Sequence, residues 1–415
     1  MSEIELKKSR RNFIKTVGAI GAGSMLASLA PVVVDASDKI SSKNNDPMTV
    51  PTRPFGKTGV NVSILALGGV LDMSDLIVFR QAMKMGVTYW DTADSYGRGK
   101  NEKAIGKYFA KFPNDRKKVF LVTKGATSDP KKLTEKLNTS LQRMNTSYVD
   151  MYFIHYVKDV KDELTNDVKA WAEKAKGEGR IRLFGFSAHK NMENSMLAAA
   201  KLGWIDGIMM SYNYRLMVKD EMKRAVDACV EAGIGLTAMK TQAAFLAYFY
   251  ATIGSKTDDA LNMTESFLQK GYTEEQAKLK VVWENPNIAS ICSAMPNMTI
   301  LQANAAAALN KNKLSLRDNQ LFEQYAQRTA SGYCAGCANI CESAIDFRVP
   351  ISDVLRCSMY YNSYRDRDKA LALFNALPTD QKADICRTDY SKGEKNCPQN
   401  IQIGKVLKKI REDLS

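Results

Sequence analysis

The stretch "GVTYWDTADSYGRGKNEKAIGKYF", from Gly86 to Phe109, contains the structural unit that decides the fold. Its first half, "VTYWDTAD", is a short apolar run that ends in polar residues and predicts a strand. The segment "NEKAIGKYFAKF" follows, and its apolar residues recur at helical spacing. A strand that leads into a helix is the building block of α/β folds with parallel sheets.

Seven other apolar runs repeat this alternation of strand and helix. They are "SILALGG", "KVFLVTKG", "YVDMYFIH", "IRLFGFSAH", "GIMMSYN", "GIGLTAMK" and "IASICSAMP". Helix-like segments such as "DPKKLTEKLNTSLQRM" and "KDEMKRAVDACVEAG" separate them, and the second ends at Gly233, a residue suited to a helix C-cap. Eight strands separated by helices over about 250 residues predict an α/β fold of the (β/α)8 TIM-barrel type. An open doubly wound sheet is the competing fold, but "LALGGV" lacks the G-x-G-x-x-G turn expected after its first strand.

Four polar residues lie at or just beyond the ends of consecutive predicted strands. Asp91 and Tyr96 lie five positions apart, Lys124 closes the third strand, and His155 closes the fourth. TIM-barrel active sites are built at this C-terminal face of the strands. One such residue alone would be read as a turn former or a solvated side chain, but four in order predict a catalytic site.

Residues 52–312 resemble the aldo-keto reductase family. The resemblance is carried by "RPFGKTGVNVSILALGG", by the stretch quoted at the outset, and by "LVTKG", "SYVDMYFIH" and "IRLFGFSAH". It implies an oxidoreductase that interconverts a carbonyl and an alcohol of a small-molecule substrate with a nicotinamide cofactor. It also implies that Asp91, Tyr96, Lys124 and His155 form the catalytic tetrad.

The chemistry of that reaction accounts for these residue types. A tyrosine hydroxyl has an unperturbed pKa of about 10 and is a poor acid near neutral pH. We expect the Lys124 ammonium to lower the pKa of Tyr96, with Asp91 holding Lys124 charged and in place. Tyr96 would then protonate the carbonyl oxygen, and His155 would hydrogen-bond the same oxygen.

The resemblance also implies that Ser187, Lys240 and Gln302 contact the cofactor, which is NADP(H) or NAD(H). Three residues common in the family's cofactor site are replaced, by Ala188, Met209 and Asn297. These replacements affect the grip on a 2'-phosphate, so both nicotinamide forms stay open.

Cysteines are concentrated near the C-terminus, where "SGYCAGCANICES" holds Cys334, Cys337 and Cys341. Residues 313–415 are predicted to form a small, mostly helical module. Within it, "VPISDVL" and "IQIGKVL" share an apolar pattern at an offset of 52 residues. The same offset relates Cys334 to Cys386, and it relates Cys397, which precedes a proline, to Ile345.

This repeat resembles a ferredoxin-type tandem with two cluster motifs. The resemblance implies one intact [4Fe-4S] site, held by Cys334, Cys337, Cys341 and Cys397, and a second site reduced to Cys386. Three alternatives stay open for these thiols, namely a four-cysteine zinc site, disulfides, and a cluster of thiols without metal.

The N-terminal residues 1–36 are predicted to be an export signal. Ser9-Arg10-Arg11-Asn12-Phe13-Ile14-Lys15 resembles the twin-arginine (Tat) pattern, and a weakly apolar run follows it. The resemblance implies passage through the Tat export machinery and a periplasmic protein, and an uncleaved signal would hold it at the membrane. Residues 37–51 are predicted to be a linker.

The net charge of +14 is not accompanied by any nucleic-acid-binding motif, so we expect a generally basic surface and no nucleic-acid partner. The cluster would be structural or would pass electrons, and in the second case an electron-transfer partner is implied. The alternative function is a non-catalytic or electron-transfer protein on a reductase scaffold, with a purely structural cluster or zinc ion.

Overall fold

The computed structural model describes residues 49–70, 75–243 and 265–414. The described residues belong to one compact unit, Thr49–Ser415. The predicted signal and almost all of the predicted linker lie outside the described residues. Within the described ranges, no helix is both long and apolar enough to span a membrane.

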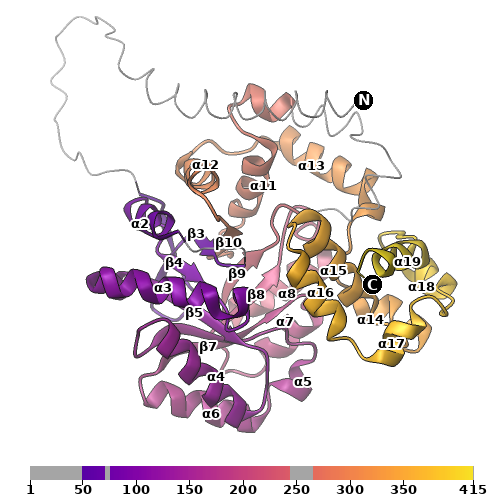
Figure 1. Cartoon of the computed structure of the whole chain (residues 1–415). Coiled ribbons are helices and arrows are strands. Elements are labelled where there is room, and N and C mark those ends of the chain that lie inside the picture. Colours follow the sequence, from indigo (N-terminus) through magenta and orange to yellow (C-terminus); the bar gives the residue numbers. More distant parts are fainter. Residues whose placement is uncertain (1–48, 71–74, 244–264, 415) are drawn as a thin grey trace, which may run out of the picture. The chain divides into compact units, whose positions relative to one another are not determined.

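Eight parallel strands close into a barrel, as the sequence predicts (Figure 1). Each strand pairs with the next along the chain, and the last pairs with the first. The strands are β3 (Leu65–Gly68), β4 (Tyr89–Asp91), β5 (Phe120–Gly125), β6 (Val149–Ile154), β7 (Ile181–Ala188), β8 (Gly207–Ser211), β9 (Gly235–Met239) and β10 (Ser290–Ala294). All eight predicted strands are therefore confirmed.

Helices surround the barrel and cover the outer faces of its strands (Figure 1). They are α2 (Leu76–Lys84), α3 (Lys100–Lys111), α4 (Pro130–Arg143), α5 (Val160–Glu163), α6 (Asn166–Gly177), α7 (Met192–Ala200), α8 (Asp220–Glu231), α11 (Glu274–Trp283) and α12 (Met298–Leu309). Local sequence sets their ends. The Asp129 carboxylate caps α4, with Pro130 at the first helical position, and Gly233 takes the left-handed conformation after α8.

A short antiparallel hairpin precedes the barrel, and no sequence pattern predicted it. Its strands, β1 (Thr52–Pro54) and β2 (Asn61–Ser63), have only three residues each. Between them, Phe55 is fully buried among inward-facing residues of the barrel. A Cβ atom on Gly207 or Gly235 would lie within 2.7 Å of the Phe55 ring, so these glycines make room for it.

The C-terminal region is helical. It contains α13 (Leu316–Arg328), α14 (Ala338–Cys341), α15 (Ile351–Ser358), a π-helical turn at Met359–Ser363, α16 (Arg367–Asn375), α17 (Thr379–Asp384), α18 (Ser391–Asn396) and α19 (Ile403–Leu414). Helix α13 packs on the barrel, where the Phe322 ring lies 5.0 Å from those of Tyr214 and Phe267. The later helices enclose a separate hydrophobic core, and we call residues 333–414 the cysteine module.

The two copies of the 52-residue repeat begin α15 and α19, and these helices pack against each other. Equivalent apolar residues of both copies share the core of the cysteine module, for example Leu355 with Leu407 and Ile351 with Ile403. The repeat therefore corresponds to a pair of packed helices.

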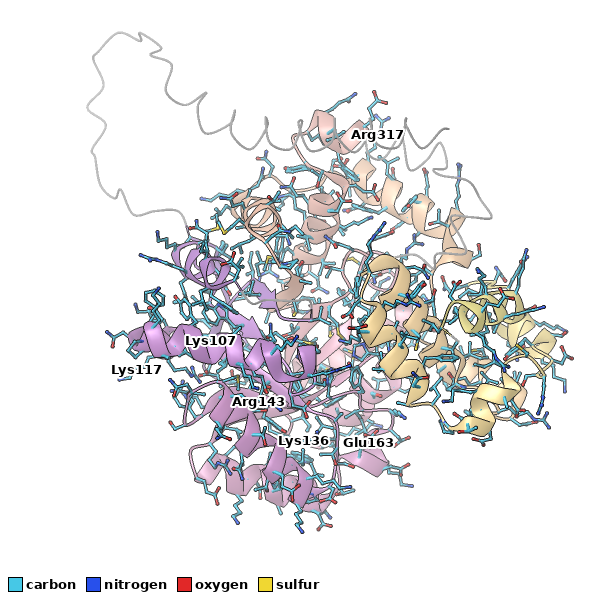
Figure 2. All side chains as sticks on the ribbon, viewed as in Figure 1. Lys107, Lys117, Lys136, Arg143, Glu163 and Arg317 are labelled. Atoms are coloured by element: carbon cyan, nitrogen blue, oxygen red, sulfur yellow. The ribbon has the colours of Figure 1, made fainter. Side chains whose placement is uncertain are left out.

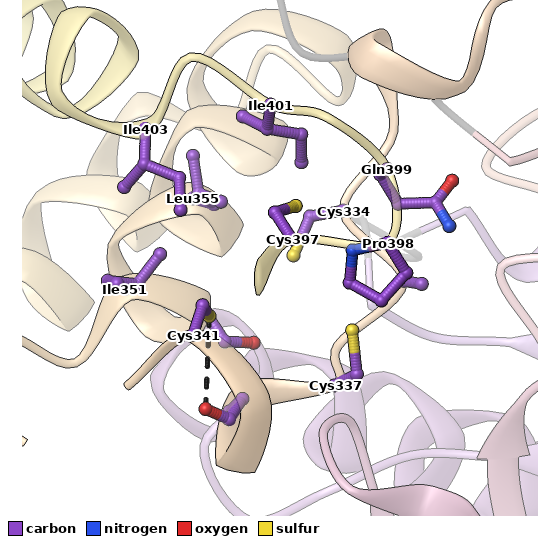
Figure 3. A pocket seen from close by; sticks show the side chains of 13 residues that line it. Cys334, Cys337, Cys341, Ile351, Leu355, Cys397, Pro398, Gln399, Ile401 and Ile403 are labelled. Atoms are coloured by element: carbon purple, nitrogen blue, oxygen red, sulfur yellow. Dashed lines mark hydrogen bonds between the residues drawn. The ribbon is translucent and has the colours of Figure 1, made fainter. Parts of the chain in front are cut away.

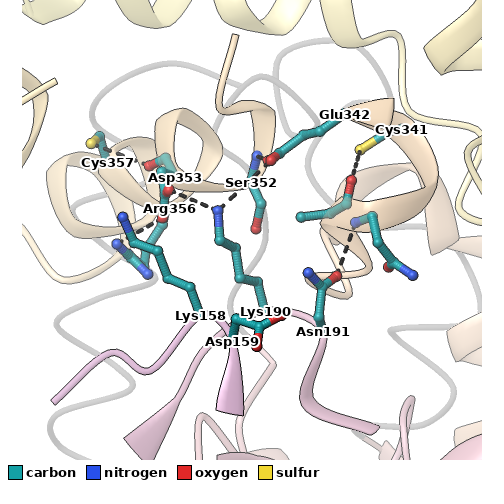
Figure 4. Close-up of polar contacts among 12 residues, drawn as sticks. Lys158, Asp159, Lys190, Asn191, Cys341, Glu342, Ser352, Asp353, Arg356 and Cys357 are labelled. Carbon is teal, nitrogen blue, oxygen red and sulfur yellow. Dashed lines mark hydrogen bonds and ion pairs between the residues drawn. The ribbon is translucent and has the colours of Figure 1, made fainter. Parts of the chain in front are cut away.

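Polar contacts join the cysteine module to the end of β7 (Figure 4). Lys190 Nζ lies 3.1 Å from Asp353 Oδ2 and 3.7 Å from Glu342 Oε2. The backbone N–H of Asn191 donates to the Gly336 carbonyl at 2.7 Å. Basic side chains elsewhere are spread over the outer helices, and Figure 2 shows Lys107, Lys117 and Arg317 among them.

Because Phe55 is fully buried, we expect Phe55→Ala to leave a cavity inside the barrel next to the β1–β2 hairpin. The substitution should lower the free energy of unfolding by about 3–5 kcal/mol. Thermal unfolding of the full chain measures the loss as a lower midpoint. The same change at Phe347, which is 60% exposed, is the matched control and should shift the midpoint little. Equal shifts for the two variants would contradict the role given to Phe55.

Candidate active site and cysteine pocket

The structure brings the four predicted catalytic residues together at the C-terminal ends of β4, β5 and β6. Lys124 Nζ lies 2.6 Å from both carboxylate oxygens of Asp91 and 2.7 Å from the Thr92 carbonyl. The two side chains are almost completely buried. Each charge is therefore compensated by the other, as buried ions require.

Tyr96 and His155 lie beside this ion pair. Tyr96 is the first residue of a 3-10 turn (Tyr96–Gly99) after β4. Lys124 Nζ lies 5.1 Å from the centroid of the Tyr96 ring. The ring centroids of Tyr96 and His155 are 5.7 Å apart, edge to face. The arrangement places an acid, a charge pair and an imidazole around one point.

The sequence-based expectation for the pKa of Tyr96 is wrong in this structure. Burial raises that pKa well above its usual value, and the Asp91 carboxylate raises it further. The physical reason is that desolvation prevails, and that the Asp91 carboxylate, which holds Lys124 through both oxygens, opposes the effect expected of the ammonium. Tyr96 is consequently protonated at neutral pH.

His155 is neutral at pH 7, because burial, together with the Lys124 ammonium, lowers its pKa well below the usual value. Its ring stacks on Tyr156 with centroids 3.6 Å apart. Among the described residues its Nδ1 has no hydrogen-bond partner. A neutral imidazole can donate a hydrogen bond from one nitrogen while accepting at the other.

Three residues of the cysteine module join this site, and the sequence reasoning missed them. Lys369 Nζ lies 4.5 Å from the centroids of both the Tyr96 and Tyr360 rings, and the Arg356 guanidinium lies 5.1 Å from that of Tyr156. No motif marks them, since their position depends on how the module docks.

Of the three predicted cofactor residues, Ser187 and Lys240 lie at or just after the ends of β7 and β9, whereas Gln302 lies on α12. Ser187 is buried, and its Oγ accepts the backbone N–H of Tyr156 at 3.3 Å. Lys240 has a left-handed backbone, and burial lowers its pKa to about 7. Gln302 is exposed on α12 and does not line the pocket around Lys240. Asn297 caps α12 by accepting the Ile300 backbone N–H at 3.0 Å.

Lys240 lies on a pocket that we call the barrel-end pocket. Its barrel side is formed by His189, Ser211 and Lys240, and its other side by residues of the cysteine module, including Tyr333 and Cys334. Both ring nitrogens of His189 and the Ser211 hydroxyl are buried without hydrogen-bond partners among the described residues. Buried polar atoms of this kind suit a polar ligand.

The four predicted cluster ligands line one second pocket, which we call the cysteine pocket (Figure 3). They are Cys334, Cys337, Cys341 and Cys397. The other walls of the cysteine pocket are largely apolar, and around the thiols they are formed by Ile351, Leu355, Ile401 and Ile403. Burial raises the pKa of Cys334 and of Cys341 to about 12.

None of the eight cysteines forms a disulfide in the structure. Cys386 is exposed and Cys357 is buried away from the cysteine pocket. In the parts of the chain that the structure describes, no three His, Cys, Asp or Glu side chains are placed to hold one metal ion.

The two pockets share a wall. Cys334 and Ala335 line both of them, and so do Ser352 and Leu355 of α15. The loop that carries the first predicted ligands therefore also closes the barrel-end pocket.

Comparisons with known proteins agree with this geometry. A model of the aldo/keto reductase family matches residues 69–324. The chain is 24% identical over 353 residues to an aldo-keto reductase of Fusarium vanettenii, covering 68% of this chain and 93% of that relative. It is 26% identical over 199 residues to a Schizosaccharomyces pombe aldo-keto reductase whose name specifies NADP(+), covering 45% of this chain and 56% of that relative.

Among solved structures, the holo form of an aldo-keto reductase from Bacillus halodurans has the same fold. The TM-score is 0.55 at 20% identity, over 67% of this chain and 96% of that one.

A closed parallel barrel with these polar groups at its C-terminal end defines a TIM-barrel oxidoreductase. The family match spans more than half of the chain, so the chain belongs to the aldo/keto reductase family. The match ends at residue 324, before the first cysteine of the cysteine pocket.

Removing the charge of Asp91 leaves Lys124 buried without its counter-ion, and we expect Asp91→Asn to cost about 3–5 kcal/mol of stability. Denaturant unfolding measures this loss. Asp220→Asn is the control, because the Asp220–Lys223 pair is exposed and should change stability by less than about 0.5 kcal/mol. A stability loss as small as the control's would show that the buried pair is dispensable.

Proposed function

We propose that this protein interconverts a carbonyl and an alcohol, with Tyr96 as the general acid and base. The observation that carries the proposal is the buried Asp91–Lys124 ion pair beside the Tyr96 ring, with the His155 ring in edge-to-face contact with that of Tyr96. In the reducing direction Tyr96, which is protonated at neutral pH, donates its proton to the carbonyl oxygen. Neutral His155 hydrogen-bonds the same oxygen and orients the substrate.

A nicotinamide cofactor supplies or accepts the hydride when bound. The barrel-end pocket is suited to it, because the unpaired His189 nitrogens and Ser211 hydroxyl offer polar contacts beside Lys240. Ser187 lies buried at the end of β7, next to this pocket's His189. The NADP(+) in the name of the Schizosaccharomyces pombe relative favours NADP(H) over NAD(H).

We further propose that Cys334, Cys337, Cys341 and Cys397 hold one [4Fe-4S] cluster. Four thiols around one apolar pocket suit such a group. The 52-residue repeat and Pro398, which follows Cys397, favour this cluster over the zinc alternative. The group would supply one-electron chemistry or a structural link.

A second cluster is not part of this proposal. At the positions equivalent to the missing ligands stand Asp389, Gly393 and Ile345, and the Ile345 side chain is buried in the core of the module. The remaining cysteine of that copy, Cys386, is exposed.

The export signal completes the proposal. Arg10 and Arg11 lie in a segment outside the described residues, and their pattern supports Tat-dependent export to the periplasm after folding. A protein that acquires a cluster and a nucleotide before export would have to retain both. We therefore include the Tat machinery and a periplasmic electron-transfer partner among the expected partners.

Tyr96→Phe removes the transferable proton and keeps the ring. We expect it to lower kcat for carbonyl reduction at least 1,000-fold, on the order of the loss of a general acid. A panel of aldehydes and ketones assayed by nicotinamide absorbance measures the loss, with cofactor binding checked by fluorescence. Tyr361→Phe is the control at a tyrosine that is partly exposed. Turnover by Tyr96→Phe at the wild-type rate would refute the proposed chemistry.

Protein purified without oxygen should contain about four irons and four sulfides per chain. Cys337→Ser removes one proposed ligand and should lower the iron content, whereas Cys386→Ser should not, because Cys386 lies outside the cysteine pocket. Iron and sulfide assays with visible spectra of the full chain measure both. One zinc per chain and no sulfide would replace the cluster by the zinc alternative.

A further inference from the structure

Lys369 carries a charge from the cysteine module into the proposed active site. It lies in the first turn of α16, and its Nζ is 4.5 Å from the centroid of the Tyr96 ring. Lys124 Nζ lies 5.1 Å from the same centroid. Two ammonium groups therefore stand against the tyrosine that is to donate the proton.

The ammonium of Lys369 has neither an ion pair nor a hydrogen bond among the described residues. Its Nζ is buried and makes no hydrogen bond within the described residues. Asp366, three residues earlier, uses its Oδ1 to accept the backbone N–H of Lys369 at 3.0 Å as the cap of α16. Burial lowers the pKa of Lys369 to about 8, so the amine is still largely charged at pH 7. A buried charge without a partner is costly, which indicates that a ligand completes the site.

The two other cations that lie against the tyrosine rings of this site are in ion pairs. Lys124 is neutralised by Asp91, and Arg356 lies 2.9 Å from Asp353. The two histidines near the site, His155 and His189, have pKa values lowered well below the usual range by burial and are neutral at pH 7. Among the cations that lie against these tyrosine rings, Lys369 is the one without an ion pair or hydrogen bond in the described parts of the chain.

We propose that the substrate is a 2-oxo acid and that Lys369 binds its carboxylate. The inference rests on the carbonyl reduction proposed above and names its substrate class. A single uncompensated positive charge matches a carboxylate monoanion better than a phosphate dianion. Because Lys369 Nζ lies 4.5 Å from the centroid of the Tyr96 ring, a carboxylate bound to it would stand next to a carbonyl that Tyr96 protonates.

The reaction then balances as follows. The carbonyl carbon gains a hydride, which a reduced nicotinamide would supply, and the oxygen gains the proton of Tyr96. The product is a 2-hydroxy acid, and Tyr96 recovers its proton from water. Tyr156 stacks on His155, and Tyr360 lies against Lys369, so the site has aromatic surroundings.

The test compares benzoylformate, an aromatic 2-oxo acid, with its methyl ester, which has the same carbonyl and no charge. Full-length protein loaded with cofactor should show a kcat/KM at least about 10-fold higher for the acid. A hydrogen bond to a charged group contributes about 1.5–3 kcal/mol, so Lys369→Met should lower this acid-to-ester ratio about 10- to 100-fold. Lys369→Arg should keep more of the ratio, and Lys408→Met, at an exposed lysine of the same module, should leave it unchanged.

An unchanged ratio in Lys369→Met, or equal losses for acid and ester, would overturn the assignment, because Lys369 would then act only through Tyr96. Calorimetric titration of benzoylformate into the same proteins separates the two proposals. Weaker binding by Lys369→Met without any turnover by the wild type would keep the carboxylate site and remove carbonyl reduction. Equal binding by both proteins would remove the carboxylate site.

Discussion

The ion pair between Lys124 and Asp91 is the constraint on which the site depends. A buried ammonium is costly unless it is paired, and here the Asp91 carboxylate and the Thr92 carbonyl, both at the end of β4, surround that of Lys124. Strands β4 and β5 must therefore pair with Asp91 opposite Val122, because a slip of one residue would turn Lys124 to the other face of the sheet. The turn that follows β4 then places Tyr96 beside the pair.

Much of this arrangement was predictable because it depends on the order of apolar and polar residues within short stretches of the sequence. Strands of a parallel barrel are buried on both sides and appear as apolar runs, so "KVFLVTKG" and "YVDMYFIH" identify β5 and β6. Since the strands of a parallel barrel end at one face, Lys124 and His155 were bound to meet there. The 52-residue offset likewise grouped Cys397 with the three distant cysteines of its pocket.

The rest depends on contacts between distant segments or on the balance of opposing effects. A strand of three residues, such as β1, is too short to show an alternating apolar pattern. Nothing in the sequence marks Phe55 as the residue that fills the barrel next to the β1–β2 hairpin. Lys369 reaches Tyr96 only through the docking of a separate module. The pKa of Tyr96 was mispredicted because residue types reveal a neighbouring charge but neither its neutralisation nor the extent of burial.

Helix α15 has a consequence that follows from its two faces. Ile351 points to the cysteine pocket, Arg356 to the barrel-end pocket, and Leu355 touches both, within a helix of only eight residues. An occupant that shifted this helix on one side would alter the shape of the pocket on the other side. Thermodynamic linkage makes such an effect reciprocal. If a filled cysteine pocket changes the affinity for the nucleotide by some factor, the bound nucleotide changes the affinity of the cysteine pocket for its occupant by the same factor.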